Sequence, residues 1–510
     1  MNKFYYPASY LVLFFFSFFI NFYYSNFGIE PMDSFVLFNG GFKVLNGLTP
    51  FKDYWLVTGP LMDYLNALFF LIFDVNWISY TIHSSLINTI ISIIVFILFI
   101  NLKLDKIFSF FYALMFSILM YPNVGVPFVD HHATIFVLLS FCLFILGVLK
   151  NNNKYFFFIP LFLLAGFLCK QTPTTYGVFA LLLLGFIYLF YVKNTKNFIL
   201  SVLSGSVCAV FIVLTFFFFT KIPISNFLTQ YIFFASSIGD YRLSNWKLDL
   251  FGVVHEFKFI LIPLLYIFYL NIISYKNKKK DNFIVLLSIS LFSILMLFHQ
   301  SLTMNENYIF FLIPILTAFI HVYKKNIKNV FLFSIIFLCL FSVIKYHLRY
   351  NEHRKFHRLE KVDLSKAIEA EKISQNLKGL KWITATYKDQ PSKEIQIILE
   401  SINLLKKEEG KFSIITDYLF IPAVLNMNDY SPNQWYHPGV SFPLQDSEYF
   451  EEYKTFFVEK LQREGISKII IVGNGLEDLL LLTFDEKCIS KSQIGQITFR
   501  LDIQNNCKEF

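Results

Sequence analysis

The sequence predicts a polytopic α-helical membrane protein that carries a soluble α/β domain at its C-terminal end. Hydrophobic residues make up 55% of the chain and charged residues 16%, and the mean hydropathy is +0.54. A membrane-spanning helix needs about 20 mainly apolar residues. Stretches of this kind recur from Tyr10 to Lys345 and stop after Tyr346. We therefore expect a transmembrane domain over 1–345 and an extracytoplasmic α/β domain over 346–510.

The apolar stretches predict about eleven spans, separated by short polar segments. The first stretch resembles a signal peptide, but no cleavage site with small residues follows it, so we expect it to be retained as a helix. The expected spans are 8–26, 78–101, 107–121, 131–149, 155–168, 177–192, 198–220, 259–275, 282–299, 306–323 and 329–345.

Lysine is distributed unevenly over the connections between these spans. Cytoplasmic connections of membrane proteins carry the excess of positive charge. The lysine-rich set therefore places the N-terminus in the cytoplasm and 346–510 outside it, in the plasma membrane or, in a bacterium, the inner membrane. The net charge of +8 does not indicate a nucleic-acid partner, because the lysines interrupt apolar runs and form no basic face. The lysine-rich connections contain Lys103, Lys106, Lys150, Lys154, Lys193, Lys196, Lys276, Lys278, Lys279, Lys280, Lys324, Lys325 and Lys328.

Ionisable residues at membrane depth gather on the predicted outer side. Such groups are costly in lipid and usually face a cavity or a pathway, so we expect an active site that opens outward. A transporter more often places them near the midplane. The cytoplasmic connections contain no Gly-rich phosphate loop, which argues against a nucleotide substrate. The outer residues are Asp33, Asp53, Asp63, Asp130, His131, His132, Lys170, Gln171, Asp240, Arg242, His255, Glu256, His299, Glu306 and Lys345.

The first outer connection, 27–77, is long and rich in glycine, proline and aromatic residues. No apolar run in it is long enough to span a membrane, so we expect short helices along the membrane surface. Asp33 follows directly on the first span and is a candidate catalytic residue at the mouth of the bundle. The alternative is that Asp33 caps a helix that begins near Ser34.

Asp130, His131 and His132 open the fourth span. Carboxylate and imidazole groups can bind a divalent metal or orient a phosphate, and Glu306 is a further candidate for contact with a metal or substrate. Neighbouring histidines on a helix point about 100° apart, so at most one is expected beside Asp130. A capping aspartate with two interfacial histidines explains the same residues without a ligand.

Lys170 ends the fifth span on the outer side, where the positive-inside tendency disfavours lysine. Contact with an anionic phosphate explains this position. A lysine that extends its ammonium group to the membrane interface explains it as well. Arg242 and Lys221 are further candidates for phosphate binding.

The part after the spans reads as a small α/β domain. Phe412–Thr416 and Lys468–Gly473 predict buried strands, and Glu448–Gly465 predicts a helix before the second strand. The charged stretch Glu352–Lys372 is expected to be helical as well.

Of the six cysteines, Cys488 and Cys507 lie in the C-terminal domain and the other four lie in or beside spans. An oxidising compartment outside the membrane favours a disulfide between Cys488 and Cys507, which would close the terminal hairpin. Two cysteines alone are too few ligands for a zinc site.

Taken in order, these features resemble the glycosyltransferase C superfold. Within it they resemble family 39, which includes the protein O-mannosyltransferases and the lipid A aminoarabinose transferases. The shared features are the long first outer connection, an Asp after the first span, a second Asp before the fourth and a Gly-x-x-x-Lys at the end of the fifth. The matching stretches are Asp33-Ser34-Phe35, Gly47–Tyr54, Gly59-Pro60-Leu61 through Phe73, Val129-Asp130-His131 and Gly166–Lys170.

The resemblance implies an inverting transfer of a sugar from a polyprenyl-phosphate carrier to a glycan, lipid or protein acceptor at the outer face. It implies that Asp33 is the general base and that Lys170 and Arg242 stabilise the departing lipid phosphate. Asp130 would position the donor or the acceptor. A lipid-linked donor agrees with the outward-opening site, because nucleotide sugars are absent outside the cytoplasm.

Two departures from the family pattern leave the sugar and the acceptor open. Ser34 stands where many relatives have a second acid, and Val57-Thr58-Gly59-Pro60 replaces the Glu-Lys pair of the aminoarabinose transferases, which argues against an aminoarabinose donor. The additional domain of the protein O-mannosyltransferases between late spans is also missing. Two other functions remain as alternatives: a transporter or flippase of a lipid-linked glycan, and a glycan polymerase or ligase of similar topology.

Overall fold

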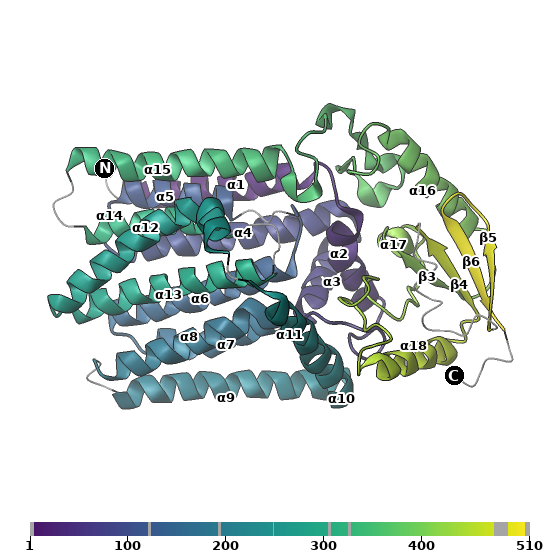
Figure 1. The fold of residues 1–510 in the computed structure, drawn as a ribbon, viewed down its shortest axis with the longest axis horizontal. Coiled ribbons are helices and arrows are strands. Elements are labelled where there is room, and N and C mark those ends of the chain that lie inside the picture. Colours follow the sequence, from purple (N-terminus) through teal and green to yellow (C-terminus); the bar gives the residue numbers. More distant parts are fainter. Residues whose placement is uncertain are drawn as a thin grey trace. The chain divides into compact units, whose positions relative to one another are not determined.

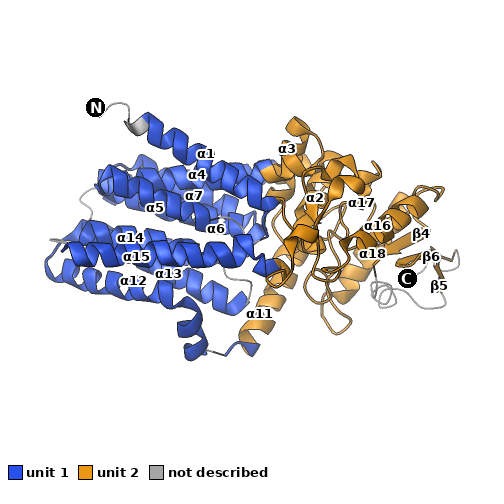
Figure 2. Ribbon diagram, turned by 90° about the horizontal axis from the view of Figure 1, so that it is seen from above, with its two compact units in different colours: residues 1–25, 82–215, 245–356 blue, residues 26–81, 216–244, 357–510 orange. Residues whose placement is uncertain are grey.

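The computed structural model describes residues 5–120, 124–191, 195–247, 249–303, 308–324, 328–473 and 488–504. The chain forms two compact units, coloured blue and orange in Figure 2. Unit 1 comprises Met1–Ser25, Ile82–Thr215 and Asn245–Phe356, and unit 2 comprises Asn26–Thr81, Phe216–Ser244 and His357–Phe510. Unit 2 therefore includes two segments that precede residue 345. The division into a transmembrane domain over 1–345 and an extracytoplasmic domain over 346–510 stays a prediction.

Unit 1 is a bundle of apolar helices (Figure 1). In the described part of the chain, eight helices are long and apolar enough to cross a membrane. Each of the eleven predicted spans coincides with one helix, and three of these helices are shorter than the others. The long helices are α1 (Tyr5–Ser25), α4 (Trp77–Asn101), α6 (Val129–Lys150), α8 (Gln171–Leu189), α9 (Thr195–Thr220), α12 (Leu250–Lys276), α13 (Lys280–Thr303) and α15 (Asn329–His347). The shorter ones are α5 (Lys106–Leu119), α7 (Lys154–Phe167) and α14 (Leu312–Tyr323).

Burial differs strongly between the helices of this bundle. Helix α6 is buried around most of its circumference and packs against α7, α8 and α13. Helix α9 exposes large apolar side chains such as Val207 and Phe211, at 69% and 68% of their surface. A helix that is apolar all round belongs in a protein core or in lipid. The chain is therefore a multi-pass membrane protein, with α6 at the centre of the bundle and α9 suited to contact with lipid.

Unit 2 combines short helices with a small mixed sheet. The sheet has the order β3-β4-β6-β5, in which β3 and β4 are parallel and the other pairs antiparallel. The predicted strands β3 and β4 and the predicted helix α18 are confirmed. The helices are α2 (Pro31–Leu45), α3 (Leu61–Phe73), α10 (Ile224–Phe227), α11 (Ala235–Asn245), α16 (Pro391–Leu405), α17 (Ile421–Val424) and α18 (Phe450–Glu464). The strands are β1 (Ile368–Glu369), β2 (Lys381–Trp382), β3 (Ser413–Thr416), β4 (Lys468–Val472), β5 (Ile489–Gln493) and β6 (Thr498–Ile503).

The segment 27–77 forms two short helices, as expected. Helices α2 and α3 have 15 and 13 residues, which is about 20 Å each and too short to span a membrane. They pack closely, because a Cβ atom on Gly41 would lie 2.6 Å from the Cβ of Asn66. Their predicted position along the membrane surface stays a prediction.

The prediction of a charged helix over Glu352–Lys372 is wrong. Arg354 and Arg358 adopt positive φ angles of 48° and 58°, which interrupt a right-handed helix. The carboxylate of Asp363 accepts a hydrogen bond from the backbone N–H of Ser365 at 3.0 Å. Such local contacts compete with helical hydrogen bonds, and the segment forms short turns.

Candidate active site

In unit 1, a buried carboxylate lies beside two basic side chains. Asp130 belongs to the first turn of α6, and its side chain is 2% exposed. Nζ of Lys170 donates a hydrogen bond to Oδ2 of Asp130 at 2.6 Å, and Nε2 of His299 lies 3.4 Å from Oδ1. A buried charge is stable only when it is paired, so Lys170 compensates the charge of Asp130, and the imidazole of His299 lies beside the same carboxylate.

Three separate chain segments bring these side chains to one end of the helical bundle. Asp130 begins α6, Lys170 lies between α7 and α8, and His299 lies close to the C-terminal end of α13. The alternation of the spans predicts that all three helix ends face the outer side. The hydroxyl of Tyr308 lies 3.1 Å from that of Thr134, one turn further along α6, and adds a polar group to the same end.

Lys170 is the most accessible member of this cluster. Its side chain is 19% exposed, whereas those of Asp130 and His299 are 2% and 0% exposed. An ammonium group has three N–H donors, and the bond to Asp130 uses one of them. The others can serve an anion that approaches from outside the cluster. A lysine that merely extends to the interface would not make this inward contact.

The two histidines that follow Asp130 contact other groups. Nε2 of His131 lies 2.6 Å from the carbonyl oxygen of Met120, and Nδ1 of His132 lies 3.0 Å from that of Phe128. Both side chains are buried. Among the described residues, no group of three or more His, Cys, Asp and Glu side chains could hold a metal ion. The imidazole beside Asp130 comes instead from a distant helix, at His299.

Asp33 lies in the first turn of α2, in unit 2, and is half-buried. The helix begins at Pro31 with Glu30 as its N-cap residue, so the alternative in which Asp33 caps a helix at Ser34 does not hold. The hydroxyl of Ser34 instead accepts a hydrogen bond from the backbone N–H of Glu30 at 3.2 Å. A carboxylate in the first turn of a helix is favoured by the helix dipole.

Asp33 is one of several charged residues of unit 2 that shift the pKa of Glu30. Burial raises the pKa of Glu30, and the neighbouring charge of Asp33 raises it further. Arg358 lowers the pKa of Glu30, whereas the charge of Asp417 raises it, and burial raises the pKa of Asp417 itself. Acids that repel one another favour the uptake of a proton by the group as a whole.

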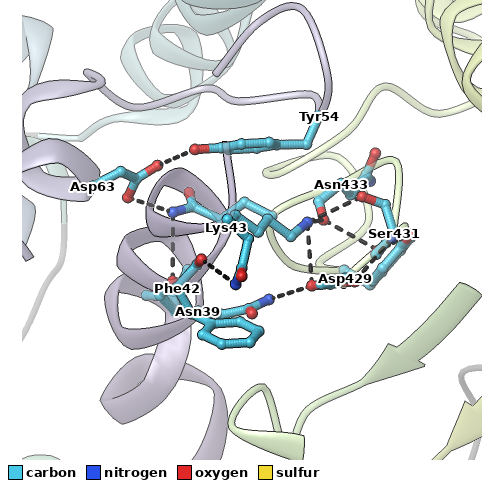
Figure 3. A network of polar contacts seen from close by, with 12 residues as sticks. Asn39, Phe42, Lys43, Tyr54, Asp63, Asp429, Ser431 and Asn433 are labelled. Atoms are coloured by element: carbon cyan, nitrogen blue, oxygen red, sulfur yellow. Dashed lines mark hydrogen bonds and ion pairs between the residues drawn. The ribbon is translucent and has the colours of Figure 1, made fainter. Parts of the chain in front are cut away.

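In unit 2, a network of polar contacts surrounds Lys43 of α2 (Figure 3). The side chain of Lys43 is fully buried, and its Nζ donates hydrogen bonds to the carbonyl oxygens of Ser431 at 3.0 Å and Asn433 at 2.8 Å. The same nitrogen lies 3.4 Å from Oδ2 of Asp429. The network ties the loop around Ser431 to α2, so its role is structural.

Asp63 of α3 is also completely enclosed. Its two carboxylate oxygens accept hydrogen bonds from the hydroxyl of Tyr54 at 2.7 Å and from Nε2 of Gln434 at 2.8 Å. Burial raises the pKa of Asp63 to about 7, although both hydrogen bonds and the charge of Lys43 act in the opposite direction. Asp63 therefore takes up a proton on folding at mildly acidic pH.

We expect Asp63→Asn to weaken the pH dependence of stability. Between pH 4 and 7 the folded protein holds a proton that the unfolded chain releases, so stability falls as pH rises through this window. A shift of about 3 pKa units sets an upper limit of roughly 4 kcal/mol on the effect. Thermal unfolding of the full-length protein in detergent, at pH 5 and pH 8, measures it. The exposed Asp446→Asn is the control, and an equal response of both variants would contradict the prediction.

The other predicted site residues have separate positions. Arg242 lies in α11 and is half-buried, and Lys221 follows α9 and is exposed; both belong to unit 2. Glu306 and Cys507 lie outside the described residues, so the disulfide with Cys488 stays a prediction. Sequence reasoning noted His299 among the outer groups but gave it no role. The signal that could have singled it out is its place at the same predicted outer end as Asp130.

Comparisons with known proteins give one kind of match. No protein-family model and no curated protein matches the chain. Among solved structures, the chain is similar to the crystal structure of ArnT from Cupriavidus metallidurans bound to undecaprenyl phosphate. The two chains are 9% identical, the match covers 99% of this chain and 98% of the other, and the TM-score is 0.47. Residue roles in the present chain therefore rest on its own contacts.

Proposed function

We propose that the protein transfers a sugar from a polyprenyl-phosphate carrier to a glycan, lipid or protein acceptor at the outer face of the plasma membrane. The observation that carries this proposal is the cluster of Asp130, Lys170 and His299. It places a fixed and partly accessible cation at one end of a bundle of membrane helices. A lipid phosphate is an anion that reaches such a position from the bilayer.

The chemistry of the transfer requires a cation at this place. When the bond between the anomeric carbon and the phosphate oxygen breaks, the polyprenyl phosphate leaves with one additional negative charge. Preorganised positive groups stabilise such charge best where water is excluded. Lys170 supplies the positive charge, and Asp130 and His299 act as positioning residues that hold its ammonium group.

Asp33 serves as the general base in this proposal. It accepts the proton of the acceptor group as the acceptor oxygen attacks the anomeric carbon from the side opposite the phosphate, which inverts the configuration. Asp33 lies in the first turn of α2 and is half-buried, so part of its side chain stays accessible to an acceptor. A divalent metal has no assigned part in these steps.

The test is a strain that lacks the gene, compared with the same strain carrying the wild-type copy. We expect the envelope glycans of the deletion strain to lack one sugar. The polyprenyl-phosphate form of that sugar should accumulate on the outer leaflet, where an enzyme added to spheroplasts can reach it. Accumulation on the cytoplasmic leaflet would instead identify a flippase. An unchanged glycan profile would contradict both functions.

A further inference from the structure

Unit 2 contains a pocket that takes no part in the proposed transfer steps. It lies between α18 and the segment 225–230, and Trp55 and Phe456 form its aromatic wall. Its volume is about 430 Å³. Ligand pockets commonly measure about 300–1,000 Å³, so this one has room for one or two sugar rings.

The aromatic wall contains a buried N–H group, Nε1 of Trp55, that donates no hydrogen bond to a described residue. Trp55 is 2% exposed, and its ring packs against Tyr453 and Phe456 at centroid distances of 5.2 and 5.7 Å. Its Nε1 is buried and has no partner among the described residues. A buried N–H group without a partner is costly, so an acceptor oxygen that comes within reach of Nε1 would be favoured beside this wall.

The pocket also has polar lining residues, and one of them is fixed in place. Gln230 is buried; its Oε1 accepts a hydrogen bond from the N–H of Leu56 at 3.0 Å, and its Nε2 donates one to the carbonyl oxygen of Phe51 at 3.1 Å. Thr229 and Thr455, which carry hydroxyl groups, also line the pocket. Amide, hydroxyl and indole groups together offer both donors and acceptors, which suits a ligand with many hydroxyl groups.

Carboxylates determine the charge that such a ligand can carry. Glu451, Glu452 and Glu459 of α18 line the pocket, and no lysine or arginine is among its lining residues. Glu452, Thr455, Phe456 and Glu459 recur at helical spacing, so one face of α18 presents them together. Like charges repel, and an anionic ligand such as a lipid phosphate is therefore disfavoured here.

We propose that this pocket binds a saccharide unit that is neutral or carries an amine, as part of the acceptor. The aromatic wall would pack against the face of the sugar ring, and the carboxylates would accept hydrogen bonds from hydroxyl or ammonium groups. The assignment to the acceptor rests on the proposed function. Binding of the saccharide itself does not.

Saccharide binding to the full-length protein in lipid nanodiscs tests the proposal. The probes are a panel of mono- and disaccharides that includes glucosamine, N-acetylglucosamine and glucose, with glucuronate as the anionic comparison. We expect saturation-transfer signals from neutral or amine-bearing members and none from glucuronate. The absence of signals from every neutral and amine-bearing member, or an equal signal from glucuronate, would overturn the proposal.

Two variants locate the binding site. Trp55→Phe keeps the aromatic ring and removes the N–H, and Glu452→Gln with Glu459→Gln removes two exposed charges from α18. A hydrogen bond between neutral groups contributes about 0.5–1.5 kcal/mol and one to a charged group about 1.5–3 kcal/mol. We therefore expect Trp55→Phe to weaken binding by up to about 10-fold, and the double glutamate variant to weaken it by about 10-fold or more. Glu360→Gln, an exposed change outside the pocket, is the matched control and should bind normally. Unchanged binding by both pocket variants would overturn the proposal.

The binding assay separates this inference from the proposed function. It uses no donor lipid, so saccharide binding can be present in a protein that transfers nothing. Conversely, if the pocket variants restore the missing sugar in the deletion strain and the wild type binds no saccharide, transfer stands and the pocket proposal fails.

Discussion

Replacing Lys170 with methionine is expected to lower the rate of sugar transfer by roughly 10²–10³-fold, which is the usual cost of removing one preorganised electrostatic group. Methionine keeps the length and the apolar stem of lysine but cannot compensate the negative charge on a departing phosphate. Lys170→Arg retains the charge and should keep part of the activity. Transfer from a purified polyprenyl-phosphate sugar, measured as released polyprenyl phosphate, gives the rate.

Lys170→Met also leaves Asp130 without its closest cation. Breaking a buried ion pair on one side costs about 3–5 kcal/mol, so loss of activity could reflect loss of the folded bundle. The double variant Lys170→Met with Asp130→Asn removes both charges and should recover the unfolding midpoint while staying inactive. Lys276→Met, at the exposed end of α12, is the matched control and should transfer at the wild-type rate.

The double variant decides between two roles of Lys170. If it transfers sugar at the wild-type rate, Lys170 only neutralises the buried carboxylate, and the proposed contact with the phosphate is wrong. If it is folded and inactive, neutralisation of Asp130 alone does not explain why activity requires Lys170.

The membrane helices could be predicted because their signal is local. About 20 consecutive apolar residues define a span, and runs such as that of α6 leave little choice of structure. The strands β3 and β4 follow from short apolar runs bounded by polar residues in the same way. The helix predicted for the charged stretch after Glu352 is wrong. Its composition suits a helix, but local side-chain contacts such as that of Asp363 favour turns in the backbone.

The contacts of the candidate site are less predictable, because they join residues far apart in the sequence. The sequence placed Asp130 and Lys170 on the same outer side but gave no reason to pair them. Helical periodicity indicates that His131 and His132 point in different directions, yet it does not tell which partners they find. The approach of His299 to Asp130 depends on the packing of α13 against α6. In unit 2, burial of Lys43 in the middle of a polar network is likewise a result of packing across the chain.

Replacing Asp33 with asparagine is expected to abolish most of the transfer, because general base catalysis typically contributes 10²–10⁴-fold. Asparagine has nearly the same shape and cannot take up the proton of the acceptor. The deletion strain carrying Asp33→Asn should lack the same envelope sugar as the strain without the gene. Asp281→Asn, the same change in the first turn of α13, is the matched control and should restore the sugar.

Equal amounts of the two variants in the membrane make this comparison decisive. Asp33 is half-buried in the first turn of α2, where the helix dipole contributes about 0.3–1 kcal/mol to a carboxylate, and equal amounts in the membrane show that Asp33→Asn still folds. Full restoration of the sugar by Asp33→Asn would therefore exclude Asp33 as the base. Because a flippase needs no base, that outcome together with accumulation of the lipid-linked sugar on the cytoplasmic leaflet of the deletion strain would favour transport over transfer.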